Sequence, residues 1–216
     1  MLIVNAVLET PDTVGFSFWP VADLPPYQFM ALSGSMSPLE VGSALAMLTD
    51  YNSRSSDDDR PLTDASEVIR RLLETDKVIA PGGLRVHNTR TNVTVRSGCC
   101  CGLEDWREWL DVADGGTLWL GHDPSPRFER ANEVVQLWPD AADAQETPSG
   151  QPIEIMVGDL PGILHTVQER LQGFLSLTKQ WATRHVPTLA EALAARLDED
   201  LAISAPLPGT SGQHAT

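Results

Sequence analysis

The distribution of apolar residues divides the chain into a strand-rich first part and a helical last part. Through most of the chain the apolar runs are short and are bounded by proline, glycine and acidic residues, as is typical of strands. They predict strands over residues 2–8, 14–19, 27–32, 77–80, 84–87, 92–96, 117–120, 133–138 and 153–157. Pro81 and the glycine pair that follows it predict a tight turn over 81–83. From Leu160 the apolar residues recur at helical spacing until Pro187, which predicts one long helix.

Helix starts are marked by a polar residue followed three positions later by glutamate, the capping-box pattern. The pairs are Ser37 with Glu40, Asp64 with Glu67, and Thr188 with Glu191. A further short helix is predicted over 103–112, with Leu103, Trp106 and Leu110 on its apolar side. Polar stretches at 52–60 and 140–151 are expected to be exposed loops.

Strands followed by helices, without strict alternation, favour an α+β fold. We expect a mostly antiparallel sheet, with helices packed on one face and a C-terminal helical pair. Of the 216 residues 42% are hydrophobic, which is enough to form one hydrophobic core. A single domain is therefore expected over residues 1–201. Residues 202–216 are rich in Pro, Gly and Ser and are expected to form a flexible tail. No apolar run approaches the roughly 18–20 residues that cross a bilayer, and the N-terminus is typical of a strand, not a signal peptide.

The charge balance bears on the partners that the protein can have. Thirty acidic residues against fifteen basic ones give a net charge of −15. Nucleic acid binding needs a basic face, so this class is disfavoured, and an acidic surface fits a basic protein partner. An alternative explanation is coding bias, because Lys77 and Lys179 are the only lysines and Ala, Gly, Pro and Asp are plentiful.

Three adjacent cysteines, Cys99, Cys100 and Cys101, are the only cysteines of the chain. Adjacent cysteines form a disulfide only with strain, and three is an odd number, so a reducing compartment and a cytoplasmic location are expected. The plainest interpretation is that they are small core residues, since cysteine is among the most buried types. No disulfide scaffold is predicted.

Two chemical interpretations of the cysteines stay open. On an extended segment Cys99 and Cys101 point to the same side and would share a soft metal such as Zn²⁺, with His122 or His87 completing the site. Contiguous cysteines lack the usual Cys-x₂₋₄-Cys zinc spacing. Alternatively Cys101, just before a helix start, would be a nucleophile with a lowered pKa and with His122 as its base. Asp123 is the nearest orienting carboxylate, although the side chains of neighbouring residues diverge.

The helix over 103–112 supplies a candidate binding surface. Trp109 lies off the apolar stripe and is the better candidate for an exposed aromatic anchor. Glu104, Asp105 and Glu108 lie on the polar side and would form an acidic recognition patch, or simply a solvated face.

Part of the chain resembles known sequences. The stretch GCCCGLEDWREW, together with WLGHDPSPRFE and VVQLWPD, resembles segments of small actinobacterial proteins to which no activity is assigned. This resemblance covers residues 98–140 and implies no catalytic residues. In size and acidity the chain is also similar to immunity proteins of polymorphic toxin systems.

The sequence therefore favours a cytoplasmic protein-binding module, of the immunity type, that inhibits a basic toxin or enzyme. The rival hypothesis is a thiol- or metal-dependent enzyme centred on residues 99–101, and a third is a structural component of a larger bacterial assembly. No phosphate-binding loop or hydrolase motif occurs, so catalysis is not the first expectation.

Overall fold

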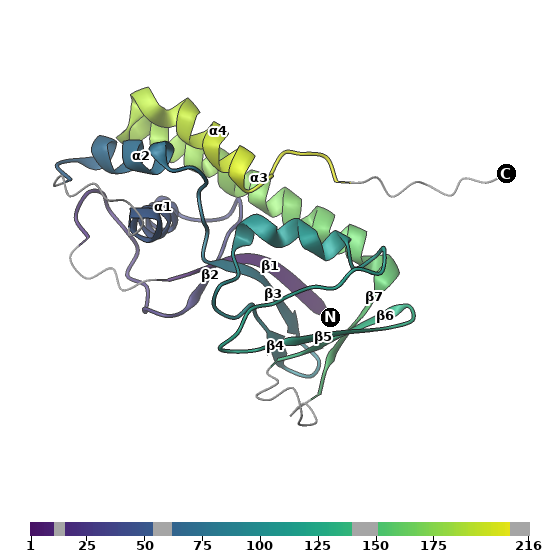
Figure 1. Cartoon of the computed structure of the whole chain (residues 1–216). Coiled ribbons are helices and arrows are strands. Elements are labelled where there is room, and N and C mark those ends of the chain that lie inside the picture. Colours follow the sequence, from purple (N-terminus) through teal and green to yellow (C-terminus); the bar gives the residue numbers. More distant parts are fainter. Residues whose placement is uncertain (11–15, 54–61, 140–150, 208–216) are drawn as a thin grey trace.

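A four-stranded antiparallel sheet lies at the centre of the fold. The computed structural model describes residues 1–10, 16–53, 62–139 and 151–207. Within these residues β1 (Leu2–Glu9) pairs with β2 (Phe29–Ala31) on one side and with β3 (Gly82–Asn88) on the other. The strand β4 (Val93–Val95) pairs with β3, so the order is β2-β1-β3-β4 (Figure 1).

A second antiparallel sheet follows later in the chain. It consists of β5 (Arg127–Ala131), β6 (Val134–Trp138) and β7 (Ile153–Met156), in the order β5-β6-β7. The strand β6 alternates between partly and fully buried residues, and Val135 and Leu137 are its fully buried positions. This alternation is the pattern of a strand with one face on a core.

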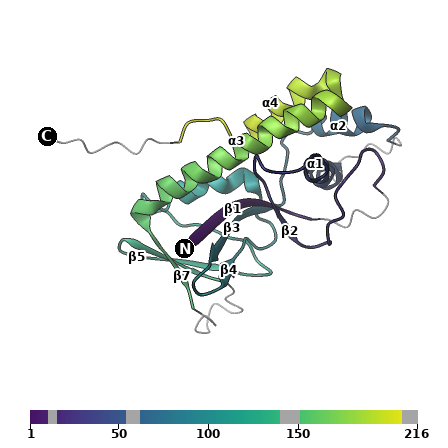
Figure 2. The ribbon, with the colours of Figure 1, turned by 180° about the vertical axis from the view of Figure 1, so that it is seen from behind.

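The helices pack together around the long α3. Their bounds are α1 Pro38–Ser53, α2 Ala65–Glu74, η1 Leu103–Leu110, η2 Val157–Asp159, α3 Leu160–His185, η3 Pro187–Leu189 and α4 Ala190–Asp200, the three η elements being 3₁₀ helices. The helix α3 contacts α1, α4, η1 and β1, and Figures 1 and 2 show it running past the central sheet. The predicted α+β class with antiparallel sheets and a C-terminal helical pair is confirmed.

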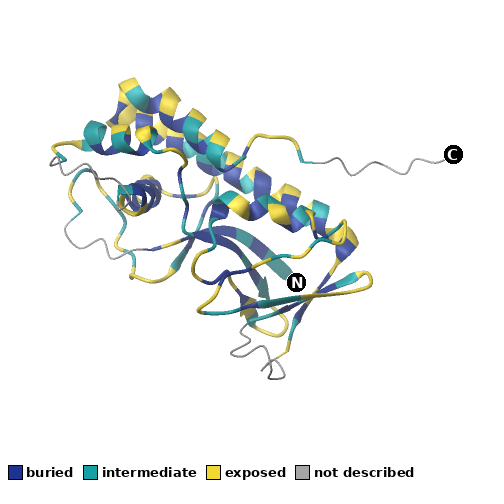
Figure 3. Ribbon diagram, in the orientation of Figure 1, coloured by how far each residue is buried: buried dark blue, intermediate teal, exposed yellow. Residues whose placement is uncertain are grey.

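Nearly all buried apolar residues of the described chain form one continuous cluster. It joins β1 through Val4, Ala6 and Leu8 to α3 through Leu171 and Phe174. In Figure 3 much of the central sheet and of the helix sides that face it is coloured as buried. Burying apolar area in this way is the main driving force for the fold.

Two of the three predicted helix starts are capped by the expected side chains. The Ser37 amide donates to Glu40 Oε2 at 2.7 Å, and the Glu40 amide donates to Ser37 Oγ at 3.3 Å, a reciprocal capping box. The Glu67 amide donates to Asp64 Oδ1 at 2.9 Å. The third predicted cap is wrong, although the helix itself is present. No side chain caps α4, and the Glu191 carboxylate instead pairs with Lys179 Nζ at 2.9 Å.

The strand predicted over 77–80 is wrong, because residue 77 lies in a bend and residues 78–80 follow an irregular path. Its backbone N–H groups are satisfied by side chains from other elements: Val78 donates to Asp200 Oδ2, Ile79 to Asn52 Oδ1 and Ala80 to Glu104 Oε2, at 2.6–3.0 Å. Three side-chain acceptors therefore replace a neighbouring strand.

The turn predicted over 81–83 is also wrong, because Gly82 and Gly83 belong to β3. Gly82 pairs with Leu8 and Gly83 with Val7. At Gly82 φ is +147°, and a Cβ there would lie 2.0 Å from the Val7 carbonyl oxygen, so only glycine fits. Glycine here permits a close approach of two strands instead of a reversal.

Other predicted elements differ as well. Residues 16–19 and 117–120 follow irregular paths, and residues 14–15 lie outside the described residues. The strand β5 was not predicted, since most of its side chains are exposed and lack apolar alternation. The stretches 54–60 and 140–150 of the predicted loops also lie outside the described residues.

Residues 202–207, expected to be frayed, are held against the domain. Ile203 is fully buried, and its carbonyl accepts a hydrogen bond from Gln168 Nε2 at 2.7 Å. Arg107 donates to the carbonyls of Ala202, Ala205 and Pro206. The rest of the predicted tail, 208–216, lies outside the described residues. Among the described helices none is long and apolar enough to span a membrane.

Candidate metal centre

Two antiparallel runs of backbone bring Cys99 and His122 together. The Cys99 amide donates to the His122 carbonyl at 2.5 Å, and the His122 amide donates to the Cys99 carbonyl at 3.3 Å. One step along, the Gly98 amide donates to the Leu120 carbonyl at 2.7 Å. Residues directly opposite each other on an antiparallel ladder project their side chains to the same face. The thiol and the imidazole therefore meet.

Glycines make the close approach of these runs possible. Gly121 has φ +85°, and a Cβ there would lie 2.6 Å from the Cys99 carbonyl oxygen and 2.8 Å from Gly98 atoms. A Cβ on Gly98 would lie 2.1 Å from the Pro124 carbonyl oxygen. Any side chain at either position would push the two runs apart. The pairing of Cys99 with His122 therefore depends on both glycines.

The second thiol of the site belongs to Cys100, not to Cys101 as predicted. Cys100 has φ +67°, a left-handed conformation that is uncommon for a residue other than glycine. The alternation of an extended strand is broken there, so the thiols of adjacent residues Cys99 and Cys100 lie on the same side, 3.7 Å apart. Such backbone conformations often occur at functional sites.

The three side chains form a compact group of possible metal ligands. Cys99 Sγ lies 3.6 Å and Cys100 Sγ 3.5 Å from His122 Nε2. In a tetrahedral zinc site, with Zn–S bonds of about 2.3 Å and Zn–N bonds of about 2.0–2.1 Å, two sulfurs lie about 3.8 Å apart and sulfur and nitrogen about 3.6 Å. The separations between the sulfurs and Nε2 match these edges in length, but Cys99 Sγ lies nearer to His122 Nδ1, at 3.1 Å, so binding of a metal through Nε2 requires the imidazole ring to turn. In the part of the chain that the structure describes, this is the one group of three or more such ligands.

Asp123 supplies a carboxylate for the other nitrogen of the His122 ring. His122 Nδ1 lies 3.4 Å from Asp123 Oδ2 and 3.1 Å from Cys99 Sγ. Asp123 has φ +51°, which turns its side chain back and overcomes the divergence expected of neighbouring residues. A proton on Nδ1, directed to this carboxylate, leaves the lone pair of Nε2 for a metal. Sequence reasoning had treated this pairing as unfavourable.

The surroundings of Cys99 oppose its ionisation. The pKa of the Cys99 thiol is raised, first because its surroundings partly desolvate it, then through its hydrogen bond and charge interaction with Cys100, and then through the charges of Asp123 and Glu9. The thiol is therefore protonated at neutral pH. The negative charges of Asp123 and Glu9 disfavour the thiolate of Cys99, and the same charges attract a divalent cation.

The nucleophile hypothesis for Cys101 is not supported. Burial, followed by the charges of Asp105 and Glu108, raises the pKa of Cys101 to about 11. The following helix carries these acidic groups, so the expected lowering at a helix N-terminus is outweighed. Cys101 Sγ lies 3.8 Å from the Trp119 carbonyl oxygen and is not one of the three clustered ligands. A nucleophilic thiol needs a lowered pKa.

Trp109 is buried, with 5% of its surface exposed, so the predicted role as a surface anchor is wrong. The error comes from the helix type: η1 is a 3₁₀ helix of three residues per turn, in which positions three apart align. Leu103, Trp106 and Trp109 accordingly form one buried face, whereas the predicted Leu110 is only half-buried.

The acidic residues of η1 have separate roles. Glu104 is half-buried and accepts the Ala80 amide at 3.0 Å, so it supports the fold. Its pKa is raised, mainly because burial disfavours the carboxylate. Asp105 and Glu108 are exposed, as predicted for a polar face, and line a depression of about 40 Å³ together with Trp119. Trp119 is 61% exposed and was not singled out from the sequence.

His87 does not belong to the group of possible metal ligands. It lies on β3 opposite Thr94 of β4, and its Nδ1 lies 2.8 Å from Thr94 Oγ1. Of the two histidines considered for the site, the structure places His122 beside the cysteines. Cys99 and His122 were both predicted for the metal interpretation, and Cys100 is the member of the group that the sequence analysis missed.

Comparison of the chain with protein-family models, with curated proteins and with solved structures finds no match. The resemblance of residues 98–140 to actinobacterial sequences therefore stays a prediction. The fold and the Cys-Cys-His group are the basis for any functional proposal.

Proposed function

We propose that this protein reversibly binds one zinc ion through Cys99 Sγ, Cys100 Sγ and His122 Nε2. The observation that carries the proposal is the clustering of two thiols and one imidazole, whose S–S separation of 3.7 Å and S–Nε2 separations of 3.5 and 3.6 Å are close to the edges of a tetrahedral zinc site, with a turn of the imidazole ring aiming Nε2 at the ion. Two thiolates and an imidazole suit a borderline-soft metal. Two thiolates would also neutralise the charge of the ion.

The exposure of the ligands favours an exchangeable ion over a structural one. Cys99, Cys100 and His122 are all exposed, and they supply three ligands where a closed structural site has four. The fourth position is left to solvent, to a substrate or to a second protein. A zinc ion with an open position supplies Lewis-acid chemistry, which is the metal-dependent form of the enzyme hypothesis. Asp123 would hold the imidazole in orientation.

Zinc affinity is expected to rise with pH across the neutral range. Because the pKa of Cys99 is raised, zinc must displace a proton that the thiol still holds at neutral pH. For each proton that zinc displaces, the apparent association constant for zinc increases about tenfold per pH unit, until the pH reaches the pKa of the thiol. Competition with a chromophoric chelator between about pH 6 and pH 8 measures this slope.

Calorimetry in buffers of different ionisation enthalpy counts the released protons directly. One zinc per chain, with affinity rising over this range, supports the proposal. A flat pH profile, or no zinc bound at equimolar concentrations, contradicts it.

A second candidate function is protein binding through an acidic surface, the immunity-type inhibitor of a basic toxin or enzyme. The observation that favours it is the exposed indole of Trp119 beside Asp105 and Glu108. An indole face and two carboxylates fit a lysine or arginine side chain of a basic partner. This surface replaces the predicted one, since Trp109 is buried and Glu104 is engaged with the backbone.

A lysine-rich peptide tests this second candidate. Its affinity is expected to fall in Trp119→Ala and Glu108→Gln, and to fall as salt is added. Glu169→Gln on α3, which removes the same charge from a remote exposed position, is the matched control. Equal effects of Glu108→Gln and Glu169→Gln would mean that only net charge matters.

A further inference from the structure

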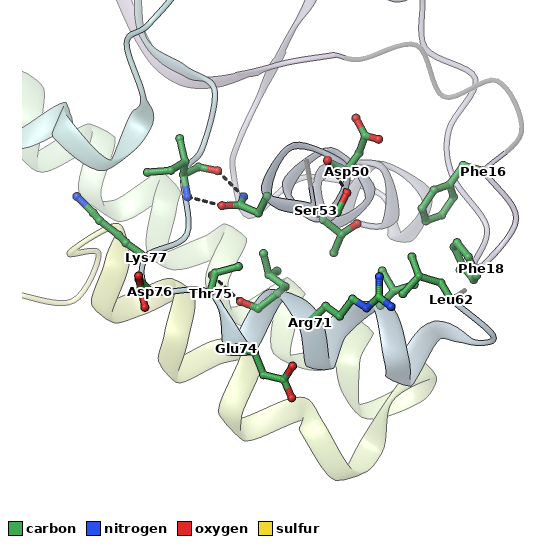
Figure 4. Close-up of a pocket in the computed structure, with 15 residues that line it drawn as sticks. Phe16, Phe18, Asp50, Ser53, Leu62, Arg71, Glu74, Thr75, Asp76 and Lys77 are labelled. Carbon is green, nitrogen blue, oxygen red and sulfur yellow. Dashed lines mark hydrogen bonds between the residues drawn. The ribbon is translucent and has the colours of Figure 1, made fainter. Parts of the chain in front are cut away.

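A cavity of about 690 Å³ lies between α1 and α2, and Arg71 and Asp50 are among its lining residues (Figure 4). Both side chains have interaction partners within the protein, and so does Asn52, whose Nδ2 donates to the carbonyls of Leu48 and Ile79 at 2.8 Å. These groups of the cavity are therefore committed to the fold. The exposed thiols of the proposed zinc site are, by contrast, open to further chemistry.

Cys99 and Cys100 form a pair of thiols that is placed for oxidation. Their sulfur atoms lie 3.7 Å apart, and both residues are exposed. The third thiol is set apart, because Cys101 is half-buried and its Sγ lies 3.8 Å from the Trp119 carbonyl oxygen. A small oxidant therefore meets one pair of neighbouring thiols instead of three equivalent ones.

The backbone around this pair makes a disulfide bond between the two sulfurs strained. The Cα atoms of adjacent residues are about 3.8 Å apart, whereas about 4.4–6.8 Å is usual across a disulfide. On one side of the pair Cys99 exchanges two backbone hydrogen bonds with His122. On the other side the Cys101 carbonyl accepts the Gly82 amide at 3.4 Å. Strained and exposed disulfides are the readily reduced, regulatory ones, so a bond formed here is expected to be reversible.

Zinc binding would hold both sulfurs in their reactive form. A thiol that coordinates a metal is deprotonated, and the thiolate is the form that attacks an oxidant. The sulfurs of a disulfide carry no negative charge for the ion, so oxidation of the pair removes two of the three proposed ligands. His122 alone would then hold the ion.

We propose that Cys99 and Cys100 form a reversible disulfide on reaction with a peroxide, and that this oxidation releases the zinc ion. The inference rests on the proposed zinc site. In the first step one thiolate attacks hydrogen peroxide, the O–O bond breaks, a sulfenic acid forms and hydroxide leaves. In the second step the other thiolate attacks the sulfenic sulfur, the S–S bond forms, the S–O bond breaks and a second hydroxide leaves. Two electrons pass from the sulfurs to the peroxide, and water or buffer protonates the two hydroxides.

Peroxide treatment of the zinc-loaded full chain, with a chromophoric chelator present, tests the proposal. Zinc binding is measured first, by chelator competition before any oxidant is added. On oxidation the wild type is expected to release one equivalent of zinc and to lose two hydrogen atoms per chain by mass spectrometry. Dithiothreitol, which reduces the disulfide by thiol exchange, is expected to restore both the mass and zinc binding.

The two proposals fail in different ways in this experiment. Protein that binds zinc but forms no internal disulfide, or that keeps its zinc when the disulfide has formed, overturns the present inference and leaves the zinc site standing. Oxidation that dithiothreitol does not reverse also overturns it, because it indicates sulfinic acid. Absence of zinc binding before the oxidant is added overturns the zinc site, and the release step falls with it.

Serine variants identify the sulfurs that take part. In Cys101→Ser only one pair of thiols remains, so an internal disulfide can join only Cys99 and Cys100, and this variant is expected to behave as the wild type. Cys100→Ser and Cys99→Ser each keep two thiols as well but lack the close pair, so neither is expected to form an internal disulfide. Equal disulfide formation in all three variants would show that closeness in sequence is enough and would contradict the assignment of the pair.

Discussion

Replacing Cys100 by serine is expected to reduce zinc affinity by more than about 100-fold. Removing a residue that only hydrogen-bonds to a metal ligand reduces metal affinity by up to about 100-fold. Because Cys100 is proposed to bind the metal itself, the loss is expected to be larger. A serine hydroxyl keeps nearly the same shape but is a poor ligand for zinc beside a thiolate and an imidazole. Chelator competition at fixed pH measures the loss.

Cys101→Ser is the matched control for this experiment. It makes the same chemical change at the next residue, whose sulfur contacts the Trp119 carbonyl instead of the ligand group. Zinc affinity is expected to stay at the wild-type value. Equal losses in Cys100→Ser and Cys101→Ser would show that the left-handed turn at Cys100 does not select the ligands. A loss confined to Cys101→Ser would restore the ligand set predicted from sequence.

Replacing Gly121 by alanine is expected to destabilise the fold and to weaken the metal site together. The φ of +85° costs an L-residue about 1–2 kcal/mol, and the overlap with Cys99 and Gly98 backbone atoms adds about 1–3 kcal/mol. The sum predicts a loss of about 2–5 kcal/mol in the free energy of unfolding. Separation of the two runs also moves His122 from Cys99, so added zinc is expected to stabilise the variant less than the wild type.

Denaturant unfolding with and without zinc measures both effects. The control is Gly162→Ala in α3, where a Cβ meets nothing within 4 Å and φ is not left-handed. Alanine in that helix is expected to be neutral or stabilising. A Gly121→Ala variant as stable and as responsive to zinc as Gly162→Ala would contradict the account of the site.

The elements that the sequence predicted correctly depend on local signals. The capping box at Ser37 and Glu40 acts within one turn of helix, so it is visible in the sequence. The long helix up to Pro187 follows from the spacing of its leucines. The path of residues 78–80 depends instead on acceptors such as Asp200, which lies 122 residues away from Val78. Such a partner leaves no local signal.

The candidate site was only partly predictable for the same reason. Cys99 and His122 were identified as metal-ligand types, but their pairing is set by an antiparallel contact over 23 residues. Cys100 was missed because a left-handed conformation at a cysteine contradicts its propensity. The misplacement of Trp109 has a simpler origin, since α-helical spacing was applied to a helix with three residues per turn. In the sequence, Gly98 and Gly121 were the residues that could have indicated a close approach of two runs of backbone.

X-ray absorption at the zinc edge, on protein loaded with one equivalent of zinc, tests the central claim most directly. The account predicts two sulfur atoms at about 2.3 Å, one imidazole nitrogen at about 2.0–2.1 Å, and one further light atom in the open position. A first shell with only nitrogen and oxygen would contradict the assignment of the cysteines. A shell of four sulfurs would instead place the ion between two molecules and contradict a site formed by a single chain.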